Sequence, residues 1–260
     1  MAKTQEHRIV MMAGPVRSTR IIYHALKSSL DIKAVIIEKQ VSRYRFLTRR
    51  AKKLGYWNVI GQILFRSIVV PCLKAASVKR AREIMDHYGL SDENIPECVI
   101  RRVASVNANE TTAILKELSP DVVIVNGTRI ISKSVLNSVP AKFINMHAGI
   151  TPLYRGVHGA YWAMVQGDYE ACGVTVHLVD AGIDTGAVLE QALIPFGRAD
   201  NFTTYPLLQL AVGIPLLKGA VQAALEDRLE PKPGAKGVSR IWSHPTLWEY
   251  LRWWWFRRVK

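Results

Sequence analysis

The segment from residue 143 to 191, FINMHAGITPLYRGVHGAYWAMVQGDYEACGVTVHLVDAGIDTGAVLEQ, carries most of the information about the fold of this chain. Its three short apolar runs predict strands, and the connections between them contain glycine and proline, which interrupt strands. Upstream, further apolar runs alternate with helical patterns, as is typical of βαβ units. The predicted strands are 8–13, 32–37, 121–125, 143–146, 174–179 and 187–194, and the predicted helices are 18–29, 110–118 and 203–225, the last broken or starting late because of Pro206 and Pro215.

This alternation predicts an α/β fold, a Rossmann-like and mostly parallel sheet with helices on both faces. Such sheets bind their ligands beyond the carboxyl ends of the strands. The chain has 260 residues, 49% of them hydrophobic, which is enough for one large domain with a sizeable core. The same composition excludes disordered proteins, collagens and disulfide scaffolds.

The cysteines and the first residues indicate the compartment. Cys72, Cys98 and Cys172 lie far apart with no CxxC pair, which predicts a reducing environment and no metal site. The start, MAKTQEHRIVMMAG, lacks the long apolar region of a secretory signal. No run of about 18 uninterrupted apolar residues occurs, so no transmembrane helix is expected. We therefore expect a cytoplasmic protein.

Three polar residues end or follow predicted strands. Asn145 and His147 are two positions apart on an extended segment and so face the same side, and Asp184 lies in the loop LVDAGIDTG. An amide and a protonated imidazole can donate hydrogen bonds to a developing oxyanion, and a carboxylate can orient the imidazole and relay a proton. The set suits acyl-type transfer, and the alternative is a structural histidine with loop-capping Asn and Asp. No serine or cysteine sits in a strained elbow, which favours direct transfer over a covalent acyl-enzyme.

Other polar residues near these motifs each have two interpretations. Arg155, Gly156 and His158, at the turn that follows Pro152, could contact an acceptor, or Arg155 could tie its loop to a backbone carbonyl. Arg17, in the turn AGPVRSTR, could hold an anion at a helix start or belong to an ordinary solvated turn. His177 alternates with core valines, which favours a core or supporting histidine over a catalytic one.

The same segment resembles the folate-dependent formyltransferases, which include glycinamide ribonucleotide, methionyl-tRNA and amino-sugar N-formyltransferases. The resemblance rests on the Asn-x-His pair, the Pro and Arg-Gly turn, the Gly-Val-Thr strand and the Asp-Thr-Gly loop, in that order. A looser match runs back through VVIVNGTRIISKSVL and covers most of residues 8–225. Two features depart from the family. Gly149 replaces the serine of the usual His-x-Ser, and AGPVRSTR lacks the Gly-x-Gly spacing of the family's nucleotide-phosphate binders.

The resemblance implies a role for each residue of the set. Asn145 would polarise the formyl carbonyl, His147 would be its positively charged partner, and Asp184 would pair with His147 and shuttle the amine proton. The implied donor is 10-formyltetrahydrofolate, with its pterin in a slot between the NGTRII segment and the DAGID loop. The residues implied to bind it through their backbone are Arg129, Ile130, Ile131, Val179, Asp180, Ala181 and Gly182.

Charge is unevenly distributed along this chain, whose net charge is +14. Twelve Lys or Arg and no acidic residue lie between Lys39 and Arg82, and residues 228–260 hold eight basic and two acidic residues. The segment 41–75 predicts a basic amphipathic helix ended by Pro71, and the run TLWEYLRWWWFRRVK predicts a Trp-rich C-terminal helix. We therefore expect a catalytic domain at 1–228 with an insertion at 41–75, followed by a linker and tail at 229–260. The cations that crowd the first half of the inserted helix are Arg43, Arg45, Arg49, Arg50, Lys52 and Lys53.

Apolar faces beside cations and aromatic rings are typical of helices that lie on membranes. We expect an anionic membrane surface as a partner, on the inner face, together with a small-molecule or lipid-linked amine substrate. The alternative is that these faces pack within the protein or against a second copy in a homo-oligomer. RNA is a third option. Nothing resembles the barrel domain that follows the catalytic domain of methionyl-tRNA formyltransferase, which counts against a nucleic-acid partner.

The function expected first is an N-formyltransferase that moves a formyl group from 10-formyltetrahydrofolate to an amino sugar linked to a nucleotide or a lipid. Glycinamide ribonucleotide is the second acceptor. A formyltetrahydrofolate hydrolase would use the same three residues with water in place of the amine. The non-enzyme alternative is a membrane or partner adaptor built on this fold.

Overall fold

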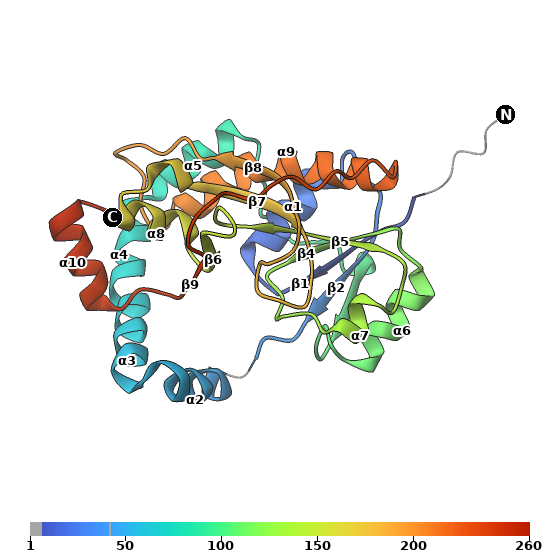
Figure 1. The fold of residues 1–260 in the computed structure, drawn as a ribbon, viewed down its shortest axis with the longest axis horizontal. Helices are drawn as coiled ribbons and strands as arrows, with labels where there is room; N and C mark the ends of the chain where they lie inside the picture. The colour runs from blue at the N-terminus through green and yellow to red at the C-terminus, as the bar shows by residue number, and fades with distance from the viewer. Residues whose placement is uncertain (1–6, 42) are drawn as a thin grey trace.

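A seven-stranded sheet with the order β3-β2-β1-β4-β5-β7-β8 forms the centre of the computed structural model (Figure 1). The structure describes residues 7–41 and 43–260, and for 43–46 and 49 only the backbone course. The five strands from β3 to β5 run parallel, and β7 and β8 pair antiparallel. The mostly parallel sheet predicted from the sequence is therefore confirmed. The strands are β1 Ile9–Ala13, β2 Ile32–Glu38, β3 Ile100–Val103, β4 Val122–Asn126, β5 Lys142–His147, β7 Gly173–Leu178 and β8 Val188–Leu193.

Strand β1 shows why helices cover both faces of this sheet. Met11 and Ala13 belong to the apolar core under α1 and α9, whereas Val10 and Met12 belong to a second core under α6 and α7. Because side chains alternate along a strand, each buried strand supplies both layers. The helices of these layers are α1 Arg17–Leu26, α5 Val78–His87, α6 Asn109–Leu118, α7 Lys133–Leu136, α8 Gly159–Gln166 and α9 Tyr205–Leu225, with 3₁₀ turns at Glu97–Val99 and Tyr169–Ala171.

The insertion predicted as one helix is broken by glycine and continues past proline. Helix α2 (Arg43–Leu54) ends at Gly55, whose φ of 85° interrupts the helical course. Helix α3 (Tyr56–Leu64), a π-helical turn η1 (Phe65–Val69) and α4 (Val70–Ala76) then follow without a gap. The predicted end at Pro71 is wrong, because Pro71 stands at the start of α4, directly after the wider turn. The prediction for the side chains of residues 43, 45 and 49 lies outside the described residues, as does that for residues 1–6.

Among the residues that the structure describes, two helical stretches of 21 residues, Tyr56–Ala76 and Tyr205–Leu225, are by length and composition apolar enough to cross a membrane, although none was expected from the sequence. The second is α9, which packs against β5, β7 and β8 and has 56% of its most apolar window buried. It starts at Tyr205 with Pro206 in its first turn, which is the late start expected from the sequence, and it is continuous through Pro215 rather than broken there. The first is only 22% buried. A core helix of a soluble domain passes the same test, so α9 needs no membrane.

The C-terminal residues pack onto the rest of the chain. Strand β9 (Arg240–Trp242) pairs in parallel with β6 (Tyr154–Gly156) in a separate two-stranded sheet. Helix α10 (Leu247–Arg257) follows, and Thr246 and Glu249 form a capping box at its start. It lies beside α3 at the edge of the molecule (Figure 1). The tail therefore reaches β6, which belongs to the edge of the site described next.

Candidate active site

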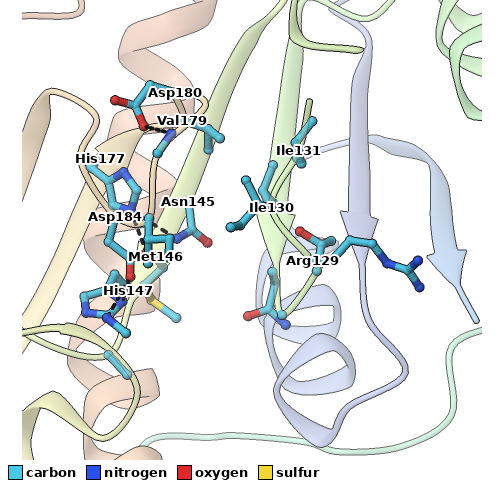
Figure 2. A pocket seen from close by; sticks show the side chains of 18 of the residues that line it. Arg129, Ile130, Ile131, Asn145, Met146, His147, His177, Val179, Asp180 and Asp184 are labelled. Atoms are coloured by element: carbon cyan, nitrogen blue, oxygen red, sulfur yellow. Dashed lines mark hydrogen bonds and ion pairs between the residues drawn. The ribbon is translucent and has the colours of Figure 1, made fainter. Parts of the chain in front are cut away.

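A cleft of about 480 Å³ opens beyond β4 and β5, where the predicted site residues meet. Asn145 and His147 reach it from β5, and Asp184 reaches it from the loop after β7. Figure 2 shows these side chains grouped on one wall, with Arg129, Ile130 and Ile131 across the cleft. Because β7 runs antiparallel to β5, it ends beside the start of β5. The loop after β7 must therefore turn back along β5 to bring Asp184 to Asn145 and His147, nearly forty positions earlier in the chain.

Asn145 is held by a histidine on the neighbouring strand. The register of β5 and β7 places His177 directly opposite Asn145, and the amide Nδ2 donates to His177 Nε2 at 3.1 Å. His177 Nδ1 lies 2.7 Å from the carbonyl oxygen of Leu178, which can only accept, so Nδ1 carries the ring proton. Burial lowers the pKa of His177 and favours this neutral form. One amide hydrogen of Asn145 is thereby fixed, and the other remains for a ligand.

His147 and Asp184 form the second contact of the site. His147 is buried, with its Nδ1 3.3 Å from Asp184 Oδ2 and its Nε2 2.8 Å from the carbonyl oxygen of Tyr154. Both partners are acceptors, so a doubly protonated imidazole can donate to both. The arrangement therefore suits a positive charge on His147.

The loop that carries Asp184 is folded on its own polar groups. Asp180 accepts hydrogen bonds from the Thr185 hydroxyl at 2.7 Å and from the Gly182 N–H at 3.0 Å. Asp184 adopts a left-handed conformation with φ of 50°, which aspartate tolerates better than most residues. Its Oδ2 also accepts from the Gly156 N–H at 3.0 Å, which ties the loop to β6. Within the described part of the chain, Oδ1 has only His177 Nε2 nearby, at 3.8 Å, so this oxygen can take a proton from a ligand.

The opposite wall holds the residues expected to bind a heterocycle. Arg129 turns away from the cleft: its guanidinium pairs with Glu38, and its backbone N–H also donates to Glu38. The Ile130 carbonyl accepts from Asn107. Ile131 is buried at the wall, whereas Ile130 is 53% exposed. Several backbone groups that were expected to bind the pterin thus already form hydrogen bonds within the protein. Among them, the N–H of Val179 donates to the Phe143 carbonyl and the N–H of Gly182 donates to Asp180.

The structure separates three of the expected acceptor-side residues from the cleft. Arg17 lines another pocket and pairs with Asp92 at 2.5 Å. His158 contacts His244 at 2.9 Å and packs on Phe202, away from Asn145. Arg155 donates to the Ile183 carbonyl at 3.3 Å, which is the loop-tying alternative left open by the sequence. Of this group, Gly156 alone lines the cleft.

Two features of the site were not assigned from the sequence. His177 was expected to be a core or supporting residue, and its bond to Asn145 depends on the register between β5 and β7. Gly149 is explained by close packing: a Cβ there would lie 2.5 Å from the Tyr154 carbonyl oxygen and 2.9 Å from His147 Nε2. The position that usually holds serine therefore has no room for a side chain in this chain.

Comparison with known proteins shows which family this chain resembles. Residues 57–206 match the family described as Formyl transferase. The methionyl-tRNA formyltransferase of Pelobacter propionicus is 30% identical over 135 residues, which are 52% of this chain and 42% of that protein. The chain thus spans less than half the length of this curated relative.

Solved structures share the fold at low identity. A phosphoribosylglycinamide formyltransferase from Anaplasma phagocytophilum is 18% identical with a TM-score of 0.57, covering 91% of this chain and 98% of its own. An N-formyltransferase from Helicobacter canadensis, in complex with folinic acid and dTDP-3-aminofucose, is 18% identical with a TM-score of 0.52, covering 90% and 70%. These likenesses confirm the predicted fold class.

Proposed function

Because this chain belongs to the formyl transferase family, we propose that it transfers a formyl group from 10-formyltetrahydrofolate to a primary amine. The observation that carries the proposal is the convergence of Asn145, His147 and Asp184 on one cleft, with His177 holding Asn145. Our preferred acceptor is an amino sugar linked to a nucleotide or a lipid.

The cleft has the features that a folate donor needs. Its volume of about 480 Å³ falls in the range of small-molecule sites. The apolar Ile130, Ile131 and Val179 can contact a flat ring, and the peptide groups of the Asp180–Asp184 loop lie alongside. The Helicobacter canadensis enzyme, which has this fold, was solved with folinic acid, itself a formyl-carrying folate. When bound, the donor supplies the formyl carbonyl.

Asn145 supplies a hydrogen-bond donor to that carbonyl, and His147, whose two ring nitrogens face Asp184 and the Tyr154 carbonyl, supplies positive charge near it. The amide hydrogen of Asn145 not used by His177 can donate to the formyl oxygen as it gains negative charge during amine attack. An imidazolium at His147, paired with Asp184, adds positive charge nearby. Donors that are held in place before the reaction stabilise this charge better than water, which must reorient.

Asp184 is the group placed to move the proton. As the amine nitrogen bonds to the formyl carbon, it must lose a proton, and the departing folate nitrogen must gain one. Oδ2 of Asp184 is engaged by His147 and Gly156, which leaves Oδ1 to accept the amine proton and pass it on to the departing folate nitrogen. Because Oδ2 is held from two sides, Oδ1 keeps its direction through the reaction.

Glycinamide ribonucleotide is the second candidate acceptor. It is supported by the phosphoribosylglycinamide formyltransferase from Anaplasma phagocytophilum, whose structure is matched by this fold over 98% of its chain. The amino-sugar proposal is supported by the Helicobacter canadensis structure, which contains a nucleotide-linked amino sugar. A cytoplasmic location remains a prediction in either case.

Formyl transfer to a panel of amines tests the proposal. Purified protein is incubated with 10-formyltetrahydrofolate and each amine, and mass spectrometry detects the added formyl group while absorbance follows folate release. We expect transfer to one class of amine and a loss of about 10²–10³ in rate for Asn145→Ala. Asp184→Asn should abolish transfer, whereas Asp227→Asn, at an exposed aspartate that also has a positive φ, should not. Folate release without any formylated amine would instead indicate a hydrolase, and inactivity with every amine and with water would indicate a non-catalytic protein.

A further inference from the structure

The helical stretch Tyr56–Ala76 has one face packed on the protein and one face open to solvent. On the packed face, Phe65 is fully buried against Phe202, and the Gln62 amide donates to the His244 carbonyl at 2.7 Å. On the open face, Tyr56 and Trp57 are 75% and 78% exposed. Three isoleucines, Ile60, Ile63 and Ile68, are exposed further along the same stretch. Their spacing places Tyr56, Ile60 and Ile63 on one side of the helix.

Helix α10 extends this apolar surface. Trp248, Leu251 and Trp255 are exposed, and their spacing of three and four residues places them on one side of α10. Trp248 joins the two helices, because its indole packs against Gly61, where a Cβ would lie only 2.4 Å from the ring. Trp254 and Phe256 are also exposed on α10, on the two flanks of that side. We call the exposed apolar residues of α3–α4 named above, together with Trp248, Leu251 and Trp255 of α10, the tryptophan surface. Its members are Tyr56, Trp57, Ile60, Ile63, Ile68, Trp248, Leu251 and Trp255.

Cations accompany the tryptophan surface. Lys52 and Lys53 are exposed at the end of α2, a few residues before Trp57. Arg252 and Arg257 are exposed on α10. No acidic residue occurs between Lys39 and Arg82. A partner for this surface must therefore offer both an apolar phase and negative charge.

We propose that the tryptophan surface binds the face of an anionic phospholipid bilayer and lies in the plane of the interface. Lipid acyl chains would cover the isoleucines, the indole rings would sit at headgroup depth, and the cations would meet lipid phosphates. Helix α3–α4 does not cross the bilayer in this arrangement, because Phe65 and Gln62 hold its other face on the domain. This inference concerns a surface outside the cleft and holds for any acceptor.

A flotation experiment tests the proposal. The full chain is mixed with phosphatidylcholine vesicles that contain or lack phosphatidylglycerol, at low salt and at about 0.5 M salt, where the Debye length is only a few ångströms. We expect flotation with the anionic vesicles at low salt and weaker binding at high salt. Lys52→Gln with Lys53→Gln should weaken partitioning about 25-fold, since each cation near such a surface contributes about fivefold. Trp57→Glu should weaken it at least about tenfold, because it removes apolar contact and adds a negative charge.

Matched controls lie elsewhere on the molecule. Leu193→Glu changes an apolar side chain that is 52% exposed at the end of edge strand β8, and Lys116→Gln with Lys142→Gln removes two exposed charges. Both controls should float like the unchanged protein, and circular dichroism should confirm that all variants fold. Absence of flotation with anionic vesicles at low salt would overturn the proposal, as would equal losses in the controls. A dimer by light scattering that Trp57→Glu converts to a monomer would show that a second copy covers this surface instead.

Discussion

Replacing His177 by leucine tests whether this histidine positions Asn145 or itself takes part in proton transfer. The variant removes the acceptor that holds the Asn145 amide at 3.1 Å. A neutral hydrogen bond contributes about 0.5–1.5 kcal/mol, so kcat should fall about 2- to 13-fold if its full worth is used to orient the amide. Asn145→Ala, which removes the donor itself, should cost about 10²–10³. The KM for the donor should change little in His177→Leu.

The pH profile of kcat provides a second readout for the same variant. Burial lowers the pKa of His177 below its ordinary value of 6.5, so the ring stays neutral at neutral pH. As the pH falls well below 6.5, the ring protonates, Nε2 can no longer accept from Asn145, and the rate should fall. His177→Leu should lack this acidic limb, and His177→Gln, which keeps an acceptor, should restore part of the rate.

Steady-state kinetics with the identified amine, urea unfolding and a control variant complete the experiment. His177→Leu leaves the Leu178 carbonyl without its donor, which should lower the free energy of unfolding by about 1–3 kcal/mol. His87→Leu, at an exposed histidine, should change neither quantity. A loss of kcat beyond about 10³ in a folded variant would show that His177 handles the proton, and an unchanged kcat would show that Asn145 needs no support.

Three further predictions concern packing and acid stability. Gly149→Ser should lower the free energy of unfolding by about 1–3 kcal/mol and should lower kcat at least about tenfold. The reason is that the serine Cβ would collide with the Tyr154 carbonyl oxygen and displace His147. A variant with a higher kcat than the unchanged protein would contradict this. Phe65→Ala should cost about 3–5 kcal/mol in urea unfolding, since Phe65 is fully buried, and a cost below about 1 kcal/mol would show that the inserted helix is not part of the core. Burial lowers the pKa of His244 to about 4, so the folded state binds fewer protons than the unfolded state below pH 6.5. The free energy of unfolding should therefore decrease as the pH is lowered, and this group alone should account for about 2 kcal/mol of the decrease at pH 5. His244→Gln should show a smaller decrease in the free energy of unfolding over the same pH range.

Local sequence patterns predicted most of the central sheet and part of the site. The apolar runs that became β1, β2, β4, β5 and β7, and the run that became edge strand β8, are consecutive residues that a local pattern can identify as strands. The two-residue spacing of Asn145 and His147 places both on one side of β5, whereas Asp184 reaches the same cleft only because the loop after β7 turns back along β5. Their roles in transfer remain predictions.

Contacts between distant segments could not be inferred in this way. The bond from Asn145 to His177 depends on the antiparallel register of β5 and β7, and the collision that excludes a side chain at position 149 depends on where β6 begins. The sequence left open whether Arg17 holds an anion or belongs to a solvated turn, and the structure pairs it with Asp92, seventy-five positions away. Strand and helix periodicity is set by neighbouring residues and is readable along the chain. Register, the partner of each polar group and the room beside each Cα arise only when the layers pack together.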